Sequence, residues 1–235
     1  MSHPYSATPY SYTGTETVSS GFFATTAGTT DPVDWVLVEL RDATTPTTVI
    51  ERRAAIIRED GLIVDTTAGS ATELSFNGIA KGNYFVVIRH RNHLGVRTAA
   101  TQLVDGSAVA PTVYDFTTAQ AQALQNGTIF TNAAMAQVST GVFGLWAGNV
   151  NQDIYVRATA SAIPAIPSDA AAILVILGGV PTATGGYSPG DVNMDGRTRA
   201  TASAIPAIPS DAAFILSTPL SGVPTATRRE HRVND

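Results

Sequence analysis

A fifteen-residue segment occurs twice near the C-terminus of this 235-residue chain, and the duplication restricts the fold more than any other feature. Residues 157–171 read RATASAIPAIPSDAA, and residues 199–213 repeat the same letters 42 positions later (199 − 157 = 42). Short repeats of this kind cannot bury their apolar residues alone and pack against one another. The two copies are therefore expected to form one pseudo-symmetric module.

Upstream of each copy, Asn and Asp alternate with other residues. The first copy has NVNQD at 149–153 and the second has DVNMD at 191–195. Each copy also has an acid before a short apolar run, Asp169 in the first and Asp211 in the second. Side-chain oxygens at alternate positions of a tight loop are the ligands that calcium needs. The pattern predicts a pair of calcium sites, and the alternative is an Asx-rich turn without an ion.

The composition favours β-structure and excludes several classes of function. Only 14% of the residues are charged and the net charge is −5, so the chain has no basic footprint for nucleic acid. It contains no cysteine, which excludes disulfides and thiolate metal sites. No apolar run is long enough to span a membrane. We expect calcium to supply the cross-links that disulfides would otherwise provide.

The chain is expected to have three parts: a strand-like tail at residues 1–31, a β-sandwich domain at 32–146 and the tandem calcium module at 147–235. Residues 34–40 and 82–89 have the apolar and β-branched composition of strands. Turn signals such as Asn77-Gly78 separate several short strands. The predicted fold class is therefore mainly β, with an antiparallel sandwich of the immunoglobulin-like or jelly-roll-like kind.

The tail is rich in Thr, Ser, Tyr, Pro and Gly and has too few apolar residues to fold alone. It must therefore pack on its own body or on a neighbouring subunit. Its alternating Thr, Tyr and Val residues favour a strand. We expect residues 5–25 to run along a strand of an adjacent subunit, because an open antiparallel sheet has an edge that must be covered. The apolar anchors of the tail are Tyr10, Tyr12, Val18, Phe22 and Phe23.

In the tandem module, Ser168 and Ser210 are expected to be the N-caps of two short helices, each followed by an acid that suits a helix start. The Ala-Ile-Pro-Ala-Ile-Pro insert before each helix has a three-residue period that favours polyproline II. Neither apolar run can bury itself alone, so the helices should face each other. The side chains expected between them are Ile173, Leu174, Ile215 and Leu216.

The sequence DVNMDG at 191–196 resembles the calcium loop of dockerin-type modules, which are EF-hand-like. The resemblance implies that Asp191, Asn193 and Asp195 supply side-chain oxygens and that Arg197 supplies its carbonyl oxygen. A twelve-residue loop would place its closing acid at Ala202, which has no ligand atom. The chain departs from the family here, and we assign the closing role to the first acid downstream, Asp211.

The first copy resembles the same loop less closely. Asn149 stands in the leading position and Ile154 stands where the second copy has its turn glycine. This copy carries fewer negative charges, so we expect the calcium site at 191–211 to be stronger than the site at 149–169. The ligands that the resemblance implies for the first copy are Asn149, Asn151, Asp153, the carbonyl of Tyr155, and Asp169.

Two further segments, VDWVLVELR at 33–41 and GNYFVVIRHRNHLGV at 82–96, precede this calcium pair. With it they resemble secreted Bacteroidota proteins often labelled hemagglutinin-like, over most of residues 10–227. The resemblance implies an extracellular, surface-associated role without a defined ligand. The doubled Ile-Pro insert is unlike the usual shorter connection, so partner recognition is not carried over.

Candidate catalytic groups are few, and we expect no enzymatic activity. His90 and His93 have a spacing that zinc can use, but no HExxH pattern accompanies them. The alternative is a turn whose imidazoles are hydrogen-bonded. Trp35, Tyr84 and Trp146 have side chains that could stack on sugars, although core packing is their commoner role.

Three classes of function remain open. The first is a non-enzymatic subunit of an extracellular filament, self-assembled through the tail and stabilised by calcium. The second is an adhesin or carbohydrate-binding module that contacts cell-surface glycans. The third, a remote alternative, is an accessory domain of a secreted glycoside hydrolase, since paired carboxylates are spaced in three dimensions rather than in sequence. We expect an extracellular or cell-surface location. Because a signal peptide is absent from the start of the sequence, we interpret the chain as a mature or excised form. The alternative is an intracellular protein.

Overall fold

A computed structural model describes residues 1–24, 30–66, 74–105, 113–126, 132–162, 165–204 and 207–231. Among these residues the structure is mainly β with two short α-helices, which confirms the mainly β part of the expected fold class, while the sandwich stays a prediction. It divides into two compact units. The sheet unit comprises Met1–His90 and Arg97–Asp115, and the repeat unit comprises Arg91–Val96 and Phe116–Val233. Among the described residues, no helix is long and apolar enough to cross a membrane.

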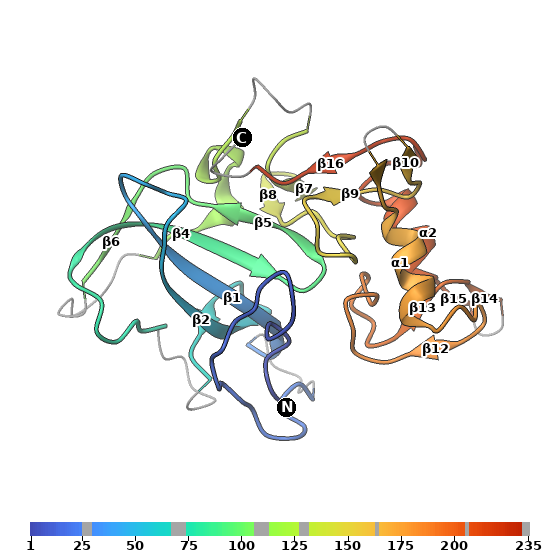
Figure 1. The fold of residues 1–235 in the computed structure, drawn as a ribbon, viewed down its shortest axis with the longest axis horizontal. Coiled ribbons are helices and arrows are strands. Elements are labelled where there is room, and N and C mark those ends of the chain that lie inside the picture. The colour runs from blue at the N-terminus through green and yellow to red at the C-terminus, as the bar shows by residue number, and fades with distance from the viewer. Residues whose placement is uncertain are drawn as a thin grey trace. The chain divides into compact units, whose positions relative to one another are not determined.

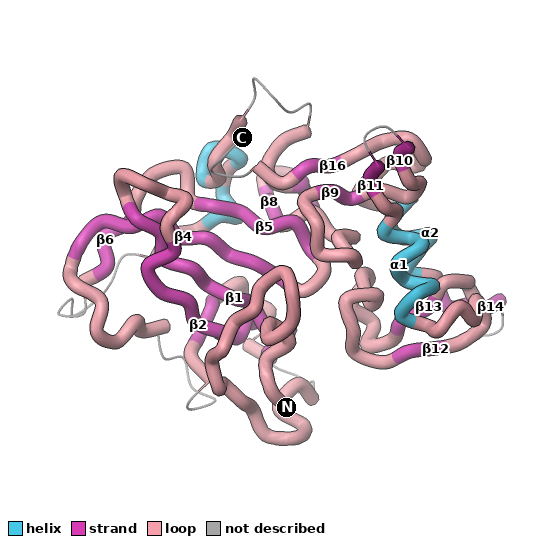
Figure 2. Tube along the Cα trace, viewed as in Figure 1, coloured by secondary structure: helices cyan, strands magenta, loops and turns pink. Residues whose placement is uncertain are grey.

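The sheet unit is built on one antiparallel sheet with the order β3-β2-β1-β4, in which β6 also pairs with β4 (Figures 1 and 2). Its strands are β1 (Pro32–Asp42), β2 (Val49–Arg58), β3 (Ile63–Val64), β4 (Gly82–His90) and β6 (Gln102–Val104). The strand β5 (His93–Arg97) contains the point at which the chain returns from the repeat unit to the sheet unit.

The central strand β1 is buried on both faces. Trp35 and Leu37 lie on one face and Val36 and Val38 on the other, and all four side chains are inaccessible or nearly so. This follows from its sequence, which is apolar at consecutive rather than alternate positions. The register places Leu37 opposite Ala54 and Trp35 opposite Ile56, so the β2 residues opposite these two side chains are also small or apolar.

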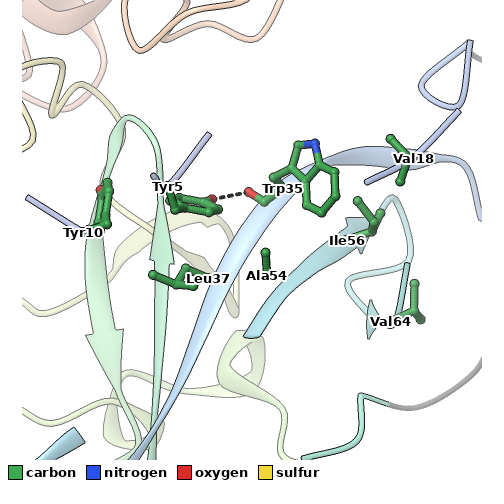
Figure 3. Packing of buried hydrophobic residues seen from close by; sticks show 8 residues of the cluster. All are labelled: Tyr5, Tyr10, Val18, Trp35, Leu37, Ala54, Ile56 and Val64. Carbon is green, nitrogen blue, oxygen red and sulfur yellow. Dashed lines mark hydrogen bonds between the residues drawn. The ribbon is translucent and has the colours of Figure 1, made fainter. Parts of the chain in front are cut away.

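The N-terminal tail packs on the Trp35 face of its own sheet (Figure 3). The Tyr5 hydroxyl donates a hydrogen bond to the Trp35 carbonyl at 2.7 Å, and the Tyr10 hydroxyl donates to the His90 carbonyl at 2.9 Å. The tail folds back on itself at a bridge between Ser2 and Thr17. Burial of its anchors within its own unit means that a neighbouring subunit is not required to cover them. Pairing of the tail with an adjacent subunit stays a prediction.

The repeat unit contains the two helices and a set of short strands. Two 3-10 turns and a short hairpin precede the first copy of the repeat. Its elements are η1 (Phe116–Thr118), η2 (Gln120–Gln122), β7 (Ala136–Ser139), β8 (Val142–Gly144), β9 (Tyr155–Val156), β10 (Ser161–Ala162), β11 (Ala165–Ile166), α1 (Asp169–Ile176), β12 (Thr184–Gly185), β13 (Thr198–Arg199), β14 (Ser203–Ala204), β15 (Ala207–Ile208), α2 (Asp211–Ser217) and β16 (Arg228–Arg229).

The two copies form one pseudo-symmetric body, as the duplication predicts. Helices α1 and α2 contact each other, and Ile173 and Ile215 are fully buried in one cluster (Figure 1). Each copy also exchanges a strand with the other, because β12 pairs with β13 and β16 pairs with β9. Leu174 and Leu216, which were also expected at this interface, are half-buried and lie outside the cluster.

Paired side-chain contacts repeat this exchange. The Thr159 hydroxyl donates to the Pro224 carbonyl at 2.9 Å, and the Thr201 hydroxyl donates to the Pro181 carbonyl at 2.9 Å. Both bonds join a residue of one copy to the segment that follows the helix of the other. The two copies are therefore linked reciprocally.

The Ile-Pro inserts form small antiparallel ladders. In the first copy Ser161 pairs with Ile166 and Ala162 with Ala165, and β14 and β15 repeat the pattern in the second. The expectation of polyproline II is therefore wrong for the described residues. A ladder gives the backbone hydrogen bonds that polyproline II lacks. Residues 163–164 and 205–206 lie outside the described residues.

Candidate metal centre

The acids expected to close the two loops begin the two helices. Asp169 and Asp211 are the first residues of α1 and α2, and both are fully buried. The preceding serines are N-caps as predicted. The Ser168 hydroxyl accepts a hydrogen bond from the Ala171 amide at 3.2 Å, and the Ser210 hydroxyl accepts one from the Ala213 amide at 2.9 Å.

Each closing acid reaches back to the backbone of its own loop. In the first copy, Oδ1 of Asp169 accepts from the amides of Val150 at 2.8 Å and Asn151 at 3.3 Å. Its Oδ2 accepts from the Arg157 amide at 2.8 Å. A carboxylate bound to backbone amides on both oxygens fixes the loop relative to the helix.

The second copy repeats these contacts at positions 42 residues later. Oδ1 of Asp211 accepts from the amides of Val192 at 2.9 Å and Asn193 at 3.4 Å. Its Oδ2 accepts from the Arg199 amide at 2.7 Å. The insert between loop and helix is therefore bridged in both copies, and the role of Asp169 and Asp211 as closing calcium ligands stays a prediction.

The leading residues of both loops carry a buried oxygen that has no hydrogen-bond donor. Asn149 and Asp191 are 3% and 1% exposed. Within the described residues, three buried side-chain oxygens have no hydrogen-bond partner, and two of these are Oδ1 of Asn149 and Oδ1 of Asp191. Buried polar atoms are nearly always satisfied. The two oxygens without a donor lie at equivalent positions of the two loops, so one explanation should account for both.

The middle positions wind the two loops in the same way. The Asp153 amide donates to Oδ1 of Asn151, and the Asp195 amide donates to Oδ1 of Asn193, both at 3.0 Å. The residues between them, Gln152 and Met194, both have φ of 60°. The local sequence thus produces the same tight turn twice.

The loops differ at the next turn. Gly196 has φ of 82° in the second copy, and its amide donates to Oδ2 of Asp191 at 3.2 Å. Ile154 occupies the equivalent position in the first copy. There the leading residue instead donates, since Nδ2 of Asn149 bonds to the Asp153 carbonyl at 2.8 Å. The amides of Tyr155 and Arg197 close a further turn on Asp153 and Asp195, at 2.6 and 2.9 Å.

Burial makes the charged form of the loop acids unfavourable. It raises the pKa of Asp169 to about 7, an effect opposed mainly by the hydrogen bond from the Arg157 amide. Burial also raises the pKa values of Asp191 and Asp211, with a further contribution from the neighbouring acids of the loop. These carboxyls lack sufficient compensating positive charge.

Two arginines contact the acids of the second loop. The Arg199 guanidinium lies 2.9 Å from Oδ2 of Asp195, and the buried Arg91 guanidinium lies 3.5 Å from Oδ2 of Asp191. Arg91 also stacks on the Tyr187 ring at 4.3 Å, and Nδ2 of Asn92 donates to the Asp191 carbonyl at 2.6 Å. Sequence reasoning missed Arg91 and Asn92, because about a hundred residues separate them from the loop.

The two histidines considered as zinc ligands have separate partners. Nε2 of His90 lies 3.0 Å from Oδ2 of Asp34, and Nδ1 of His93 lies 2.7 Å from Oδ1 of Asn92. Across the described part of the chain, no three or more His, Cys, Asp or Glu side chains are arranged to hold a metal ion. A cation at either loop would therefore need amide and carbonyl oxygens in addition to carboxylates.

Comparison with known proteins gives no relative. No protein-family model, curated protein or solved structure matches this chain. The resemblance to hemagglutinin-like and dockerin-type proteins therefore stays a prediction, and the function is proposed below from the residues themselves.

Proposed function

We propose that this chain is a non-enzymatic, extracellular structural protein whose repeat unit is a dockerin-like module stabilised by two calcium ions. The observation that carries the proposal is the pair of buried, donor-free oxygens on Asn149 and Asp191. These two residues occupy the leading positions of their loops, in which backbone amides donate hydrogen bonds to the other side chains that would serve as ligands. A bound cation is the common explanation that accounts for both.

The residues present fit calcium rather than a softer metal. Calcium takes oxygen ligands from carboxylates, amides and backbone carbonyls, and it tolerates irregular geometry. Asp191, Asn193, Asp195, Asp211 and the Arg197 carbonyl would hold the second ion. The first ion would be held by the equivalent set, Asn149, Asn151, Asp153, Asp169 and the Tyr155 carbonyl. A divalent charge would also favour the ionised form of the buried acids, whose pKa values are raised.

Calcium would act here as a cross-link. Each set of ligands combines the acid that begins a helix with residues of a loop about 20 residues earlier in the chain. A cation that binds only the folded state stabilises it by about 2.7 kcal/mol at 100 times its dissociation constant. In a chain without cysteines, such ions take the place of disulfides.

Thermal unfolding tests this proposal directly. The melting temperature should rise saturably by about 5–10 °C between a chelator and excess calcium. Magnesium at the same concentration should have a smaller effect, because it requires near-octahedral coordination and loses water reluctantly. Equal melting temperatures in chelator and in calcium would contradict the proposal.

We further propose that the protein is a filament subunit whose tail exchanges between neighbours. The tail packs into a defined site on the sheet, formed around Trp35 and Leu37. The same site on an adjacent subunit would accept the same anchors, and repetition of this exchange gives an open polymer. The burial of β1 on both faces supports the related proposal that its sheet is one layer of a sandwich.

A peptide of residues 1–24 provides the test for tail exchange. Negative-stain images of the full chain should show filaments, and excess peptide should shorten them by occupying the acceptor site. A chain that lacks these residues should be destabilised, because Tyr5 and Tyr10 belong to its core, and the peptide should restore its stability. Absence of filaments across a wide range of protein concentrations would contradict the proposal.

The second candidate is an adhesin that binds cell-surface glycans. The observation that favours it is Tyr187, which is 41% exposed and backed by the Arg91 guanidinium. An exposed ring held in a fixed orientation suits stacking on a sugar. Trp35 is fully buried and is unsuited to this role. Loss of glycan binding in a Tyr187→Ala variant, without loss of stability, would favour this function.

A further inference from the structure

Glu39 on β1 lies at the centre of an arginine cluster, outside the calcium loops. Its side chain is 2% exposed. Nη2 of Arg41 lies 2.6 Å from Oε2 of Glu39, and Nε of Arg52 and Nε of Arg89 each lie 3.2 Å from its Oε1. These residues come from β1, β2 and β4, which are adjacent in the sheet.

The register explains why these side chains meet. Glu39 is directly opposite Arg52 on β2, and Arg41 is opposite Phe85 on β4. Residues opposite each other in an antiparallel pair project to the same face. The cluster therefore lies on the face that also carries Trp35 and Leu37, farther along β1.

Arg97 adds a fourth guanidinium. It is 9% exposed, and its Cζ lies 4.1 Å from the centre of the Phe85 ring. Within the part of the chain that the structure describes, its Nε is buried and has no hydrogen-bond partner, and its guanidinium forms no ion pair. Burial lowers the pKa of Arg97, and repulsion from Arg41 lowers it further.

The acids on neighbouring segments do not neutralise this group. Glu51 is opposite Leu40 and so projects to the other face of the sheet. The Asp42 carboxylate accepts hydrogen bonds from two amides and a hydroxyl of its own turn, and Asp105 pairs with Lys81. Among the described residues, Glu39 thus pairs with Arg41, Arg52 and Arg89, and none of these acids pairs with Arg97.

We propose that this arginine cluster, Arg41, Arg52, Arg89 and Arg97, binds an oxyanion group of the sulfate, phosphate or carboxylate class. Arg97 and Arg41 contact the ligand, while Arg52 and Arg89 keep Glu39 compensated. Planar guanidinium groups match two oxygens of such a group at once and bind it more tightly than ammonium groups do. Stacking on Phe85 holds one face of Arg97 and leaves its N–H edge for the ligand.

The cost of burial favours this role over simple packing. A buried charge without a partner is unfavourable, and a protein normally removes the charge or pairs it. Arg97 is permanently charged at neutral pH, so pairing with an anion would compensate its charge more fully than the Phe85 ring does. The proposal is independent of calcium, since none of these residues belongs to the repeated loops.

Ion titration of the full chain tests the site. Sodium sulfate, sodium phosphate and sodium acetate are each compared with sodium chloride at equal ionic strength, with a chelator present throughout. At least one oxyanion should raise the melting temperature saturably by several degrees beyond chloride. Sulfate also stabilises proteins without binding, in a manner that does not saturate. Saturation by sulfate or phosphate identifies a tetrahedral ligand, and saturation by acetate alone identifies a carboxylate.

Two variants separate this site from general salt effects. Arg97→Gln should abolish the saturable response and, because it removes an uncompensated charge, should melt at a higher temperature than wild type in chloride. Arg58→Gln removes an arginine of β2 that pairs with Asp60 outside the cluster, and it should keep the full response. Nitrogen NMR of the wild-type protein follows the Arg97 Nε–H resonance directly if the variant does not fold. An unshifted resonance, or an equal response in wild type and Arg97→Gln, would overturn the proposal.

Discussion

The two calcium loops share a backbone but differ in charge. Asp169 and Asp211 bind the same three amides in each copy, at nearly equal distances. The first loop begins with Asn149 and the second with Asp191, and in the second loop Asp191 and Asp195 lie beside Arg91 and Arg199. The closing acid therefore determines the shape of each loop. The leading residue and the nearby arginines determine its electrostatics, so the two properties can be changed separately.

The largest expected effect comes from the closing acids. Asp169→Ala or Asp211→Ala leaves three amides of its loop without an acceptor, which should destabilise the protein by about 4 kcal/mol even in chelator. Urea unfolding monitored by circular dichroism measures the change. An unfolding free energy equal to that of the wild type in either variant would show that the common shape of the loops does not depend on these carboxylates.

Exchange of the leading residues should change calcium affinity. Asp191→Asn gives the second loop the charge of the first and should weaken its calcium binding by about tenfold, because affinity follows the number of ligand charges. Asn149→Asp should strengthen the first site by a similar factor. Isothermal titration calorimetry of both variants and the wild type measures these constants. Unchanged affinities would show that the charge of the leading residue does not cause the difference in calcium affinity between the two sites.

The raised pKa of Asp169 predicts a pH dependence in chelator. The folded pKa of about 7 lies above the ordinary value of 3.8, so the folded state holds the proton more tightly. The contribution to stability is complete below about pH 4 and is lost as the pH rises to 7. Thermal melts between pH 4 and 7 should show this decline. Asp169→Asn, which keeps an acceptor but does not titrate, should flatten it.

The smallest expected effect concerns the arginines that compete with calcium. Arg199→Gln frees Oδ2 of Asp195 and should strengthen calcium binding at the second loop by about threefold, the scale of a partly exposed ion pair. Arg157 is the equivalent residue of the first copy, and Arg157→Gln provides the matched control with little effect expected. Equal changes in the two variants, measured by calorimetry, would show that the ion pair is not responsible.

The sequence was sufficient for features that repeat or act locally. The 42-residue duplication predicts paired helices, and their contact helps to bury Ile173 and Ile215 in one cluster. Ser168 and Ser210 act on amides three residues away, so their capping role is readable from the local pattern. The predicted ligands recur at equivalent positions of both loops, although calcium itself stays a prediction.

Features that depend on distant segments were not predictable in this way. Arg91 reaches Asp191 across about a hundred residues, and Glu39 meets Arg89 only because β1 and β4 are neighbours. The position of the tail on Trp35 likewise depends on which surface the finished sheet exposes. The Ile-Pro inserts show a local limit, because a three-residue period gave no sign that the backbone would pair with itself.

The exchange of strands between the two copies makes them a single thermodynamic unit. The strand that follows each helix, β12 in the first copy and β16 in the second, pairs with a strand of the other copy. A fragment with one copy would therefore expose an unpaired strand edge and would associate with a second fragment. Opening one copy therefore opens the other. Ions at the two loops would share this folding equilibrium, and occupation of one site would raise the apparent affinity of the other without any contact between the ions.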